Sequence, residues 1–285
     1  MSEMKNAVGA GTGRSGDDLC AGNSVREFKI WADVLNYGKK ILKNAGIAEA
    51  DLDSWYLFEE IFGISRAQYF LCARENIVGS TAQKIAVQEQ HGDLLESGNA
   101  LECAELWLKE KLSAYENALK KRAARIPLQQ IIGQQEFMGL SFFVNEHVLI
   151  PRQDTETLVE EALKKIRPGM QILDMCTGSG CILLSLLLEL PQALGTGVDV
   201  SEGALCVAKE NRKRLGLEQR AELIQSDLFS ADYFRKNSGN DHMEYDMLIS
   251  NPPYIRTEDI EGLMEEVRFH DPVLALDGKE NGLYF

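Results

Sequence analysis

The stretch that determines the fold reads Ile172-Leu173-Asp174-Met175-Cys176-Thr177-Gly178-Ser179-Gly180-Cys181. Its beginning is typical of a buried strand over 171–175, and a helix is expected from Ser179 to Leu190. A glycine-rich turn between a strand and a helix lets the backbone approach a ligand closely at the N-terminus of that helix. The sequence therefore predicts a strand–turn–helix unit with a ligand site at the turn.

Strands and helices continue to alternate on the C-terminal side of this turn. Strands are expected at 171–175, 194–199, 221–225 and 246–250, and helices at 179–190 and 201–215. Ser201 is a favourable N-cap and Gly216 a favourable C-cap for the second helix. This alternation predicts βαβ units with right-handed crossovers, and thus a doubly wound α/β domain over 151–285.

The residues before 151 are expected to form three segments: a loose tail over 1–24, a small helical bundle over 25–125 and a linker over 126–150. Helices are expected up to Gly46, then near 52–62, 67–73 and 103–124, with a loop at 91–100 and a further helix at 155–166 after the linker. In the linker, a β-hairpin is predicted around Gly139-Leu140, with Gly139 opening a type II′ turn.

The composition excludes several classes of protein. Of the 285 residues, 45% are hydrophobic and 26% are charged, which is the balance of a globular protein and not of a disordered chain. No secretory signal or membrane-spanning stretch is visible. The six cysteines form no C-x-x-C pair, which favours reduced thiols in a cytoplasmic protein and no metal site. A net charge of −14 argues against a general nucleic-acid binder.

The spacing of the residues around the glycine-rich turn limits the classes of ligand that it can bind. Leu183 stands where a dinucleotide-binding G-x-G-x-x-G would have its third glycine, and no Gly-Lys-Ser/Thr follows to form a phosphate-binding Walker loop. Asp199 ends the next predicted strand, where a carboxylate can accept both hydroxyls of a ribose. The pattern favours a nucleoside, although a glycine-rich turn without a ligand remains an alternative for this motif alone.

A second motif, Asn251-Pro252-Pro253-Tyr254, directly follows the predicted strand 246–250. The prolines restrict the backbone and lack N–H donors, so the Pro252 carbonyl and the Asn251 side-chain oxygen are available as acceptors. Two acceptors directed at one point can orient a planar –NH2 group. The Tyr254 ring can stack on the planar system that carries this group. The motif therefore predicts recognition of an amino group on a planar system.

Together these motifs resemble the signatures of S-adenosylmethionine-dependent methyltransferases that modify planar amino groups. The residues concerned are Gly178, Gly180, Asp199, Ser226-Asp227 and Asn251-Pro252-Pro253-Tyr254. A narrower resemblance lies in 126–133, Glu136-Phe137 and 148–156. It is to the bacterial peptide chain release factor glutamine N5-methyltransferases, the PrmC/HemK family, and it covers roughly residues 28–285.

The resemblance implies methyl transfer from S-adenosylmethionine to the side-chain nitrogen N5 of the glutamine in the Gly-Gly-Gln motif of class-I release factors. It implies a monomer whose helical bundle recognises the substrate, with no membrane and no nucleic-acid substrate. The implied cofactor-binding residues are Cys176, Thr177, Gly178, Ser179, Gly180, Asp199, Asp227, Leu228 and Asn251. The implied substrate-binding residues are Asn251, Pro252, Pro253 and Tyr254, of which Asn251, Pro252 and Tyr254 are expected to be catalytic.

The sequence departs from the family pattern at three places. Cys176 stands where a glycine is common, and Gln153 replaces a frequent proline. The sequence ends at Phe285, so only four strands of a seven-stranded methyltransferase sheet are expected, with an apolar edge left open at strand 246–250. The missing strands predict either a truncated methyltransferase domain or an incomplete sequence.

Two other functions remain open from the sequence. One is a DNA or RNA methyltransferase that modifies an exocyclic amine on a flipped base. The other is a catalytically silent, truncated protein whose helical bundle still binds a partner. The linker residues and the negative net charge favour the release-factor reading over the nucleic-acid one.

Overall fold

The computed structural model describes residues 28–88, 99–236 and 244–285. The predicted tail lies outside these residues, as does the predicted loop at 91–100 up to residue 98. The last two residues of that predicted loop, Asn99 and Ala100, are helical instead. The described chain divides into two compact units: one contains residues up to 37 with 64–114, and the other contains 38–63 with 115–285.

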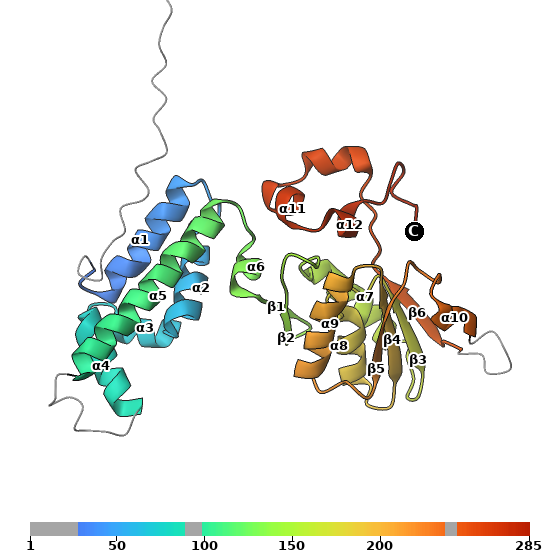
Figure 1. The fold of residues 1–285 in the computed structure, drawn as a ribbon, viewed down its shortest axis with the longest axis horizontal. Coiled ribbons are helices and arrows are strands. Elements are labelled where there is room, and N and C mark those ends of the chain that lie inside the picture. Colours follow the sequence, from blue (N-terminus) through green and yellow to red (C-terminus); the bar gives the residue numbers. More distant parts are fainter. Residues whose placement is uncertain (1–27, 89–98, 237–243) are drawn as a thin grey trace, which may run out of the picture. The chain divides into compact units, whose positions relative to one another are not determined.

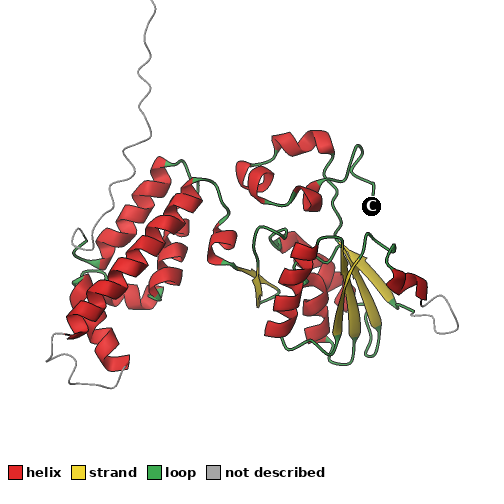
Figure 2. Cartoon of the chain, in the orientation of Figure 1, coloured by secondary structure: helices red, strands yellow, loops and turns green. Residues whose placement is uncertain are grey.

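The first part of the chain is helical, as expected (Figures 1 and 2). The helices are α1 (Trp31–Asn44), α2 (Ala50–Phe62), α3 (Arg66–Cys72), α4 (Ile77–Gln88) and α5 (Asn99–Ala123). Gly63 ends α2 with a left-handed φ of 62°, and Ser65 begins α3 with a capping box. Helix α4 is an addition to the predicted set.

Each unit has its own packing in this helical part. In the first unit the Trp31 indole N–H donates to Ser80 Oγ at 3.0 Å, which ties α1 to α4. In the second, the rings of Phe58, Phe62 and Tyr115 pack edge to face or tilted, joining α2 to α5. The Tyr115 hydroxyl also donates to the Ser54 carbonyl at 3.2 Å.

The linker forms a short helix, α6 (Leu128–Ile132), followed by strands β1 (Gln134–Phe137) and β2 (Leu140–Phe143). The hairpin is confirmed, but its turn lies one residue earlier than predicted. Met138 and Gly139 are the two turn residues and both have positive φ, which is the signature of type I′ rather than type II′. Met138 tolerates this conformation where its N–H donates to Glu156 Oε1 at 2.7 Å.

The second half contains a four-stranded parallel sheet, as the alternating pattern predicts (Figure 2). Its strands are β3 (Gln171–Met175), β4 (Leu194–Asp199), β5 (Ala221–Gln225) and β6 (Met247–Ser250). The helices of this half are α7 (Gln153–Leu163), α8 (Cys181–Glu189), α9 (Glu202–Arg214) and α10 (Asp232–Lys236). After β6 follow a 3-10 helix (Thr257–Gly262), α11 (Glu265–His270) and α12 (Val273–Leu276).

Both faces of the sheet are covered. Ile172 packs with α7 and α8 in one core cluster, whereas its neighbour Leu173 belongs to a second cluster with Phe234 of α10. Because successive strand residues point to opposite faces, the two clusters lie on opposite sides of the sheet. The doubly wound α/β architecture is therefore confirmed.

The strand order β5-β4-β3-β6 places a topological switch between β3 and β6. Within the described residues β6 pairs only with β3, and Leu248 on this edge strand is 57% exposed. No helix in the described ranges has the length and apolar character needed to cross a bilayer.

Candidate active site

The switch point brings together the two segments that the sequence singled out. Strands β3 and β6 run parallel and are paired as far as Met175 and Ser250. The glycine-rich turn and the Asn251–Tyr254 loop therefore leave the sheet side by side at its carboxyl edge. Ser250 Oγ donates to the Met175 carbonyl at 2.6 Å and joins the two exits. Ligands of open α/β sheets bind at this kind of position.

The turn after β3 is strongly bent by three residues with positive φ. Cys176, Gly178 and Gly180 have φ of 62°, 56° and 80°. A side chain at Gly180 would come within 3.0 Å of Leu184, so this glycine permits close packing of α8. At Gly178 nothing lies within 4 Å of an added Cβ, so the backbone here faces open space. The turn thus offers bare backbone to a ligand.

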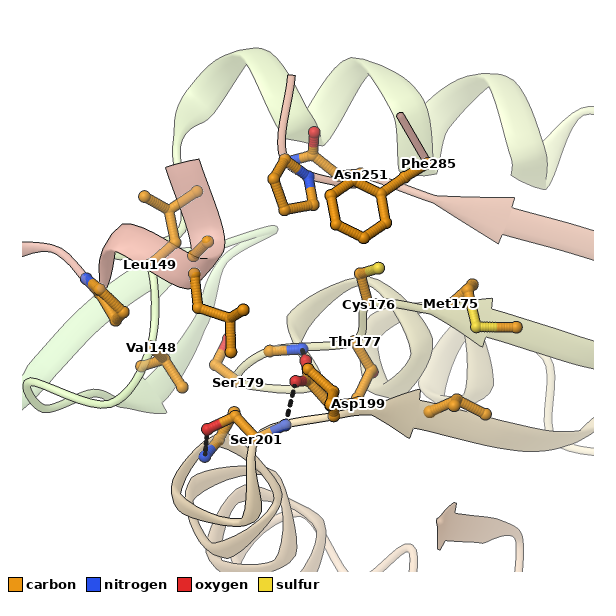
Figure 3. A pocket seen from close by; sticks show the side chains of 18 of the residues that line it. Val148, Leu149, Met175, Cys176, Thr177, Ser179, Asp199, Ser201, Asn251 and Phe285 are labelled. Carbon is orange, nitrogen blue, oxygen red and sulfur yellow. Dashed lines mark hydrogen bonds between the residues drawn. The ribbon is translucent and has the colours of Figure 1, made fainter. Parts of the chain in front are cut away.

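Asp199 at the end of β4 holds this turn in place. Its Oδ2 accepts the Gly178 N–H at 2.9 Å and its Oδ1 accepts the Ser201 N–H at 2.9 Å (Figure 3). A carboxylate has about four lone-pair directions, so each oxygen can accept one further bond from a ligand hydroxyl. The structure therefore gives Asp199 a structural role that the sequence did not predict, and it leaves acceptor capacity for the expected one.

Burial raises the pKa of three groups around the turn. It raises the pKa of the Asp174 carboxyl to about 7, and Thr177 Oγ1 donates to that carboxyl at 2.6 Å. Burial also raises the pKa of the Asp199 carboxyl, and this effect outweighs the backbone N–H hydrogen bonds to the carboxyl, which lower its pKa. Burial, with the nearby carboxylates, raises the pKa of the Cys176 thiol to about 11, so this thiol is protonated at neutral pH.

The Asn251 side chain lies across the cavity from Cys176 (Figure 3). Its Nδ2 donates to Thr155 Oγ1 at 3.5 Å, and Thr155 belongs to the first turn of α7. Tyr254 at the far end of the motif is 64% exposed. The motif therefore places its asparagine in the cavity and its tyrosine at the surface.

A later segment braces the loop that contains Tyr254. The Ile255 N–H donates to the Leu276 carbonyl at 3.0 Å, and the Gly278 N–H donates to the Ile255 carbonyl at 2.7 Å. A Cβ at Gly278 would lie 2.8 Å from Tyr254 Cα, and one at Gly282 would lie 2.5 Å from the Tyr254 carbonyl oxygen. Only glycine allows the two backbones to approach this closely.

One cavity of about 290 Å³ unites most of the predicted site residues. Those that line it are Cys176, Thr177, Gly178, Ser179, Asp199, Asp227, Leu228, Asn251 and Pro253. Gly180, Pro252 and Tyr254 are outside its lining. The remaining lining is mainly apolar, which suits a small organic ligand held by a few polar groups.

Two segments line the cavity without having been assigned to it from the sequence. The end of the linker and the start of α7 contribute His147–Arg152 and Thr155. The segment after β6 contributes Pro272, Leu274, Ala275, Lys279, Tyr284 and Phe285. The linker had been marked by its resemblance to the family, which was the available signal. The later segment had none, because its contact with the site depends on how the chain folds back after β6.

Comparison with known proteins agrees with this arrangement. Residues 153–271 match the family model described as the methyltransferase small domain, and residues 33–88 match the PrmC N-terminal domain. The release factor glutamine methyltransferase of Caulobacter vibrioides is 36% identical over 247 residues, covering 86% of this chain and 72% of the relative. That of Geobacter sulfurreducens is 44% identical over 176 residues, covering 62% of this chain and 58% of the relative.

A solved S-adenosylmethionine-dependent methyltransferase from Geobacter sulfurreducens, in complex with S-adenosyl-L-homocysteine, matches a smaller part. The two sequences are 31% identical, and the match covers 28% of this chain and 31% of the solved chain, with a TM-score of 0.25.

The fold and the family model define a Rossmann-like methyltransferase domain. More particularly, the chain belongs to the family of release factor glutamine methyltransferases.

Proposed function

We propose that the chain transfers a methyl group from S-adenosylmethionine to the side-chain nitrogen N5 of the glutamine in the Gly-Gly-Gln motif of class-I release factors. Family membership supports the release factor as substrate class. The single observation that carries the proposal is the position of Asn251, which lines the same cavity as the turn after β3. We expect the chain to act in the cytoplasm, and residues 25–125 to recognise the substrate; the family as a whole is expected to be monomeric.

The residues around the turn fit the proposed cofactor. The backbone at Gly178 is open on the cavity side, and Asp199 retains acceptor capacity for ribose hydroxyls. The other proposed cofactor-binding residues that line the cavity are Cys176, Thr177, Ser179, Asp227, Leu228 and Asn251. Bound S-adenosylmethionine supplies an electrophilic methyl group on its sulfonium. Gly180 would contribute by allowing α8 to pack against the turn.

The proposed task of Asn251 is to orient the amide nitrogen of the substrate. An amide nitrogen is a poor nucleophile, so its alignment with the methyl carbon matters. Asn251 Oδ1 would accept one N–H, the Pro252 carbonyl would accept the other, and Tyr254 would stack on the amide plane. Pro252 and Tyr254 do not line the cavity, so their roles depend on how the substrate loop enters. No general base is required, because the nitrogen becomes acidic once it is methylated.

The test is transfer of a labelled methyl group to purified release factor, with duplex DNA and ribosomal RNA assayed in parallel. We expect label on the Gly-Gly-Gln glutamine and none on nucleic acid. Replacing Asn251 with Ala removes one of the two acceptors, so turnover should fall at least about tenfold, and by a larger factor than the affinity for the cofactor.

Asn145→Ala is the matched control, because Asn145 does not line the cavity and its side chain accepts one backbone N–H, that of His147. This variant should keep the turnover of the unmodified chain. Label on nucleic acid with the release factor unmodified would overturn the proposal in favour of a base methyltransferase. Absence of transfer to any substrate, with binding of release factor retained, would support a silent binding protein.

A further inference from the structure

The hydrogen bond between Asn251 and Thr155 joins two segments that are 96 residues apart. Thr155 is the third residue of α7 and lines the cavity, as does Asn251. Within the described residues, the Asn251 side chain makes this one hydrogen bond, and the donor is Nδ2. Asn251 Oδ1 is the atom of this amide that is left to accept from a ligand.

The direction of this bond matters because the two ends of an asparagine amide are similar in shape and opposite in chemistry. Nδ2 donates two hydrogen bonds, whereas Oδ1 only accepts. If the amide rotates by half a turn, it presents a donor where an acceptor is needed. An N–H of a substrate amide would then face another N–H. An acceptor at Asn251 is therefore effective only if something fixes the rotation of the side chain.

We propose that Thr155 is a positioning residue for Asn251: its Oγ1 accepts from Nδ2, so that Oδ1 remains available for the N–H of the substrate amide. This inference rests on the proposed function of Asn251. At 3.5 Å the bond is long, as bonds in catalytic sites often are before the substrate is bound, and we expect it to shorten in the complex.

Thr155 is itself held firmly, as a positioning residue must be. Its backbone N–H donates to the Arg152 carbonyl at 3.0 Å. The next residue, Glu156, accepts the Met138 N–H at 2.7 Å and so ties the start of α7 to the hairpin turn. Val159, one turn further along α7, is buried in the main core cluster. The hydroxyl therefore projects from a helix that is anchored at both the linker and the core.

Nuclear magnetic resonance of the ¹⁵N-labelled chain tests the contact without any turnover. The side-chain NH2 signal of Asn251 is identified as the one missing from Asn251→Ser. Thr155→Val keeps the branched shape but removes the acceptor, so this signal should shift. Thr155→Ser keeps the hydroxyl and should leave the signal near its original position. An Asn251 signal that is unchanged in Thr155→Val would overturn the proposal.

Kinetics of methyl transfer to the release factor provide the second measurement. Thr155→Val should lower kcat about five- to tenfold, the effect of one lost hydrogen bond, while KM for the cofactor stays the same. Thr155→Ser keeps the hydroxyl and should retain most of the kcat of the unmodified chain. Equal rates for the valine and serine variants would contradict the proposal.

Thr196→Val is the matched control. Thr196 lies in β4 outside the cavity lining. Its Oγ1 accepts from the Tyr245 hydroxyl at 3.0 Å, and its side chain also hydrogen-bonds Tyr233, so the substitution removes hydrogen bonds elsewhere. It should change neither the Asn251 signal nor kcat. If the Asn251 signal shifts in Thr155→Val but the unmodified chain transfers no methyl group, the contact is supported and the proposed function is refuted. Failure of the positioning role and failure of the proposed function are therefore distinguishable.

Discussion

At the scale of single residues, Cys176 combines a side chain with a backbone conformation that favours glycine. Its φ of 62° costs a non-glycine residue about 1–2 kcal/mol. A glycine would avoid this cost, but it would lower stability by about 0.5–1 kcal/mol because it gives the unfolded chain more conformational freedom. We therefore expect Cys176→Gly to raise the free energy of unfolding by up to about 1 kcal/mol, measured by urea denaturation.

The control for this prediction is Cys206→Gly. Cys206 is exposed within α9, where glycine lowers stability by about 1 kcal/mol relative to a good helix former. The two substitutions should thus have opposite signs. A loss of stability in both variants would show that the Cys176 side chain contributes more through its contacts than its backbone conformation costs.

Asp174 should make the stability of the fold depend on pH. Burial raises its pKa from 3.8 to about 7, so between these values the folded chain holds a proton that the unfolded chain releases. Stability contributed by this group is therefore lost as the pH rises through that range. Asp271, whose pKa burial raises to about 6, acts in the same direction.

We expect Asp174→Asn to flatten this dependence, because an amide does not ionise. The measurement is the free energy of unfolding of both chains at about pH 5 and about pH 8. The control is Asp232→Asn at an exposed position, which should leave the pH dependence of stability unchanged. An Asp174→Asn profile as steep as the original would show that other groups cause the dependence.

The candidate site could be predicted only in part at this scale. Cys176, Gly178, Asp199 and Asn251 were expected together because each lies at or just after the carboxyl end of a strand of one parallel sheet, and these ends share an edge. Thr155 was recognised only as part of a family-like segment. Its contact with Asn251 depends on where α7 packs, and no local pattern encodes that distance.

At the scale of elements, strand β6 should cause association of the purified chain. It pairs on one side only within the described residues, and its exposed Leu248 adds an apolar surface to the unpaired backbone. Sedimentation velocity at increasing concentration should show association. Leu248→Lys should reduce it, because an edge lysine disfavours strand pairing.

Leu106→Lys is the control, since Leu106 is 70% exposed on helix α5 and offers no strand edge. It should associate like the unmodified chain. A compact monomer at all concentrations, before any substitution, would show that this edge is tolerated in solution.

The strands were easier to predict than the turns and short helices. Strands β3, β4 and β5 coincide with the predicted ranges because buried parallel strands are short apolar runs between clear turn residues. The hairpin turn was misplaced because a contact from Glu156, distant in sequence, stabilises Met138 in a left-handed conformation. Segments such as α11 are too short for a periodic pattern to identify them.

At the scale of the whole molecule, binding of the product S-adenosylhomocysteine should stabilise the second unit. A ligand that binds only the folded state adds about 2.7 kcal/mol at a concentration one hundred times its Kd. We expect the midpoint of thermal unfolding to rise with ligand concentration. Asp199→Ala should weaken binding by about 1–3 kcal/mol, the range for a lost hydrogen bond to a charged group.

Because Asp199 also holds the Gly178 backbone, its removal should lower the unfolding midpoint without ligand as well. Calorimetric titration separates the two effects, since it reports affinity directly. An Asp199→Ala chain that binds the ligand as tightly as the original would remove Asp199 from the cofactor site and leave its structural role.

The close approach of Gly278 and Gly282 to Tyr254 has a consequence for exchange of backbone amides with deuterated water. The amides of Ile255 and Gly278 are bonded across the two segments, so neither can exchange until the segments separate. Both amides should therefore exchange at a common rate set by one opening event. That rate measures how often the loop containing Asn251 loses its support, and a side chain introduced at Gly278 should accelerate it at both positions.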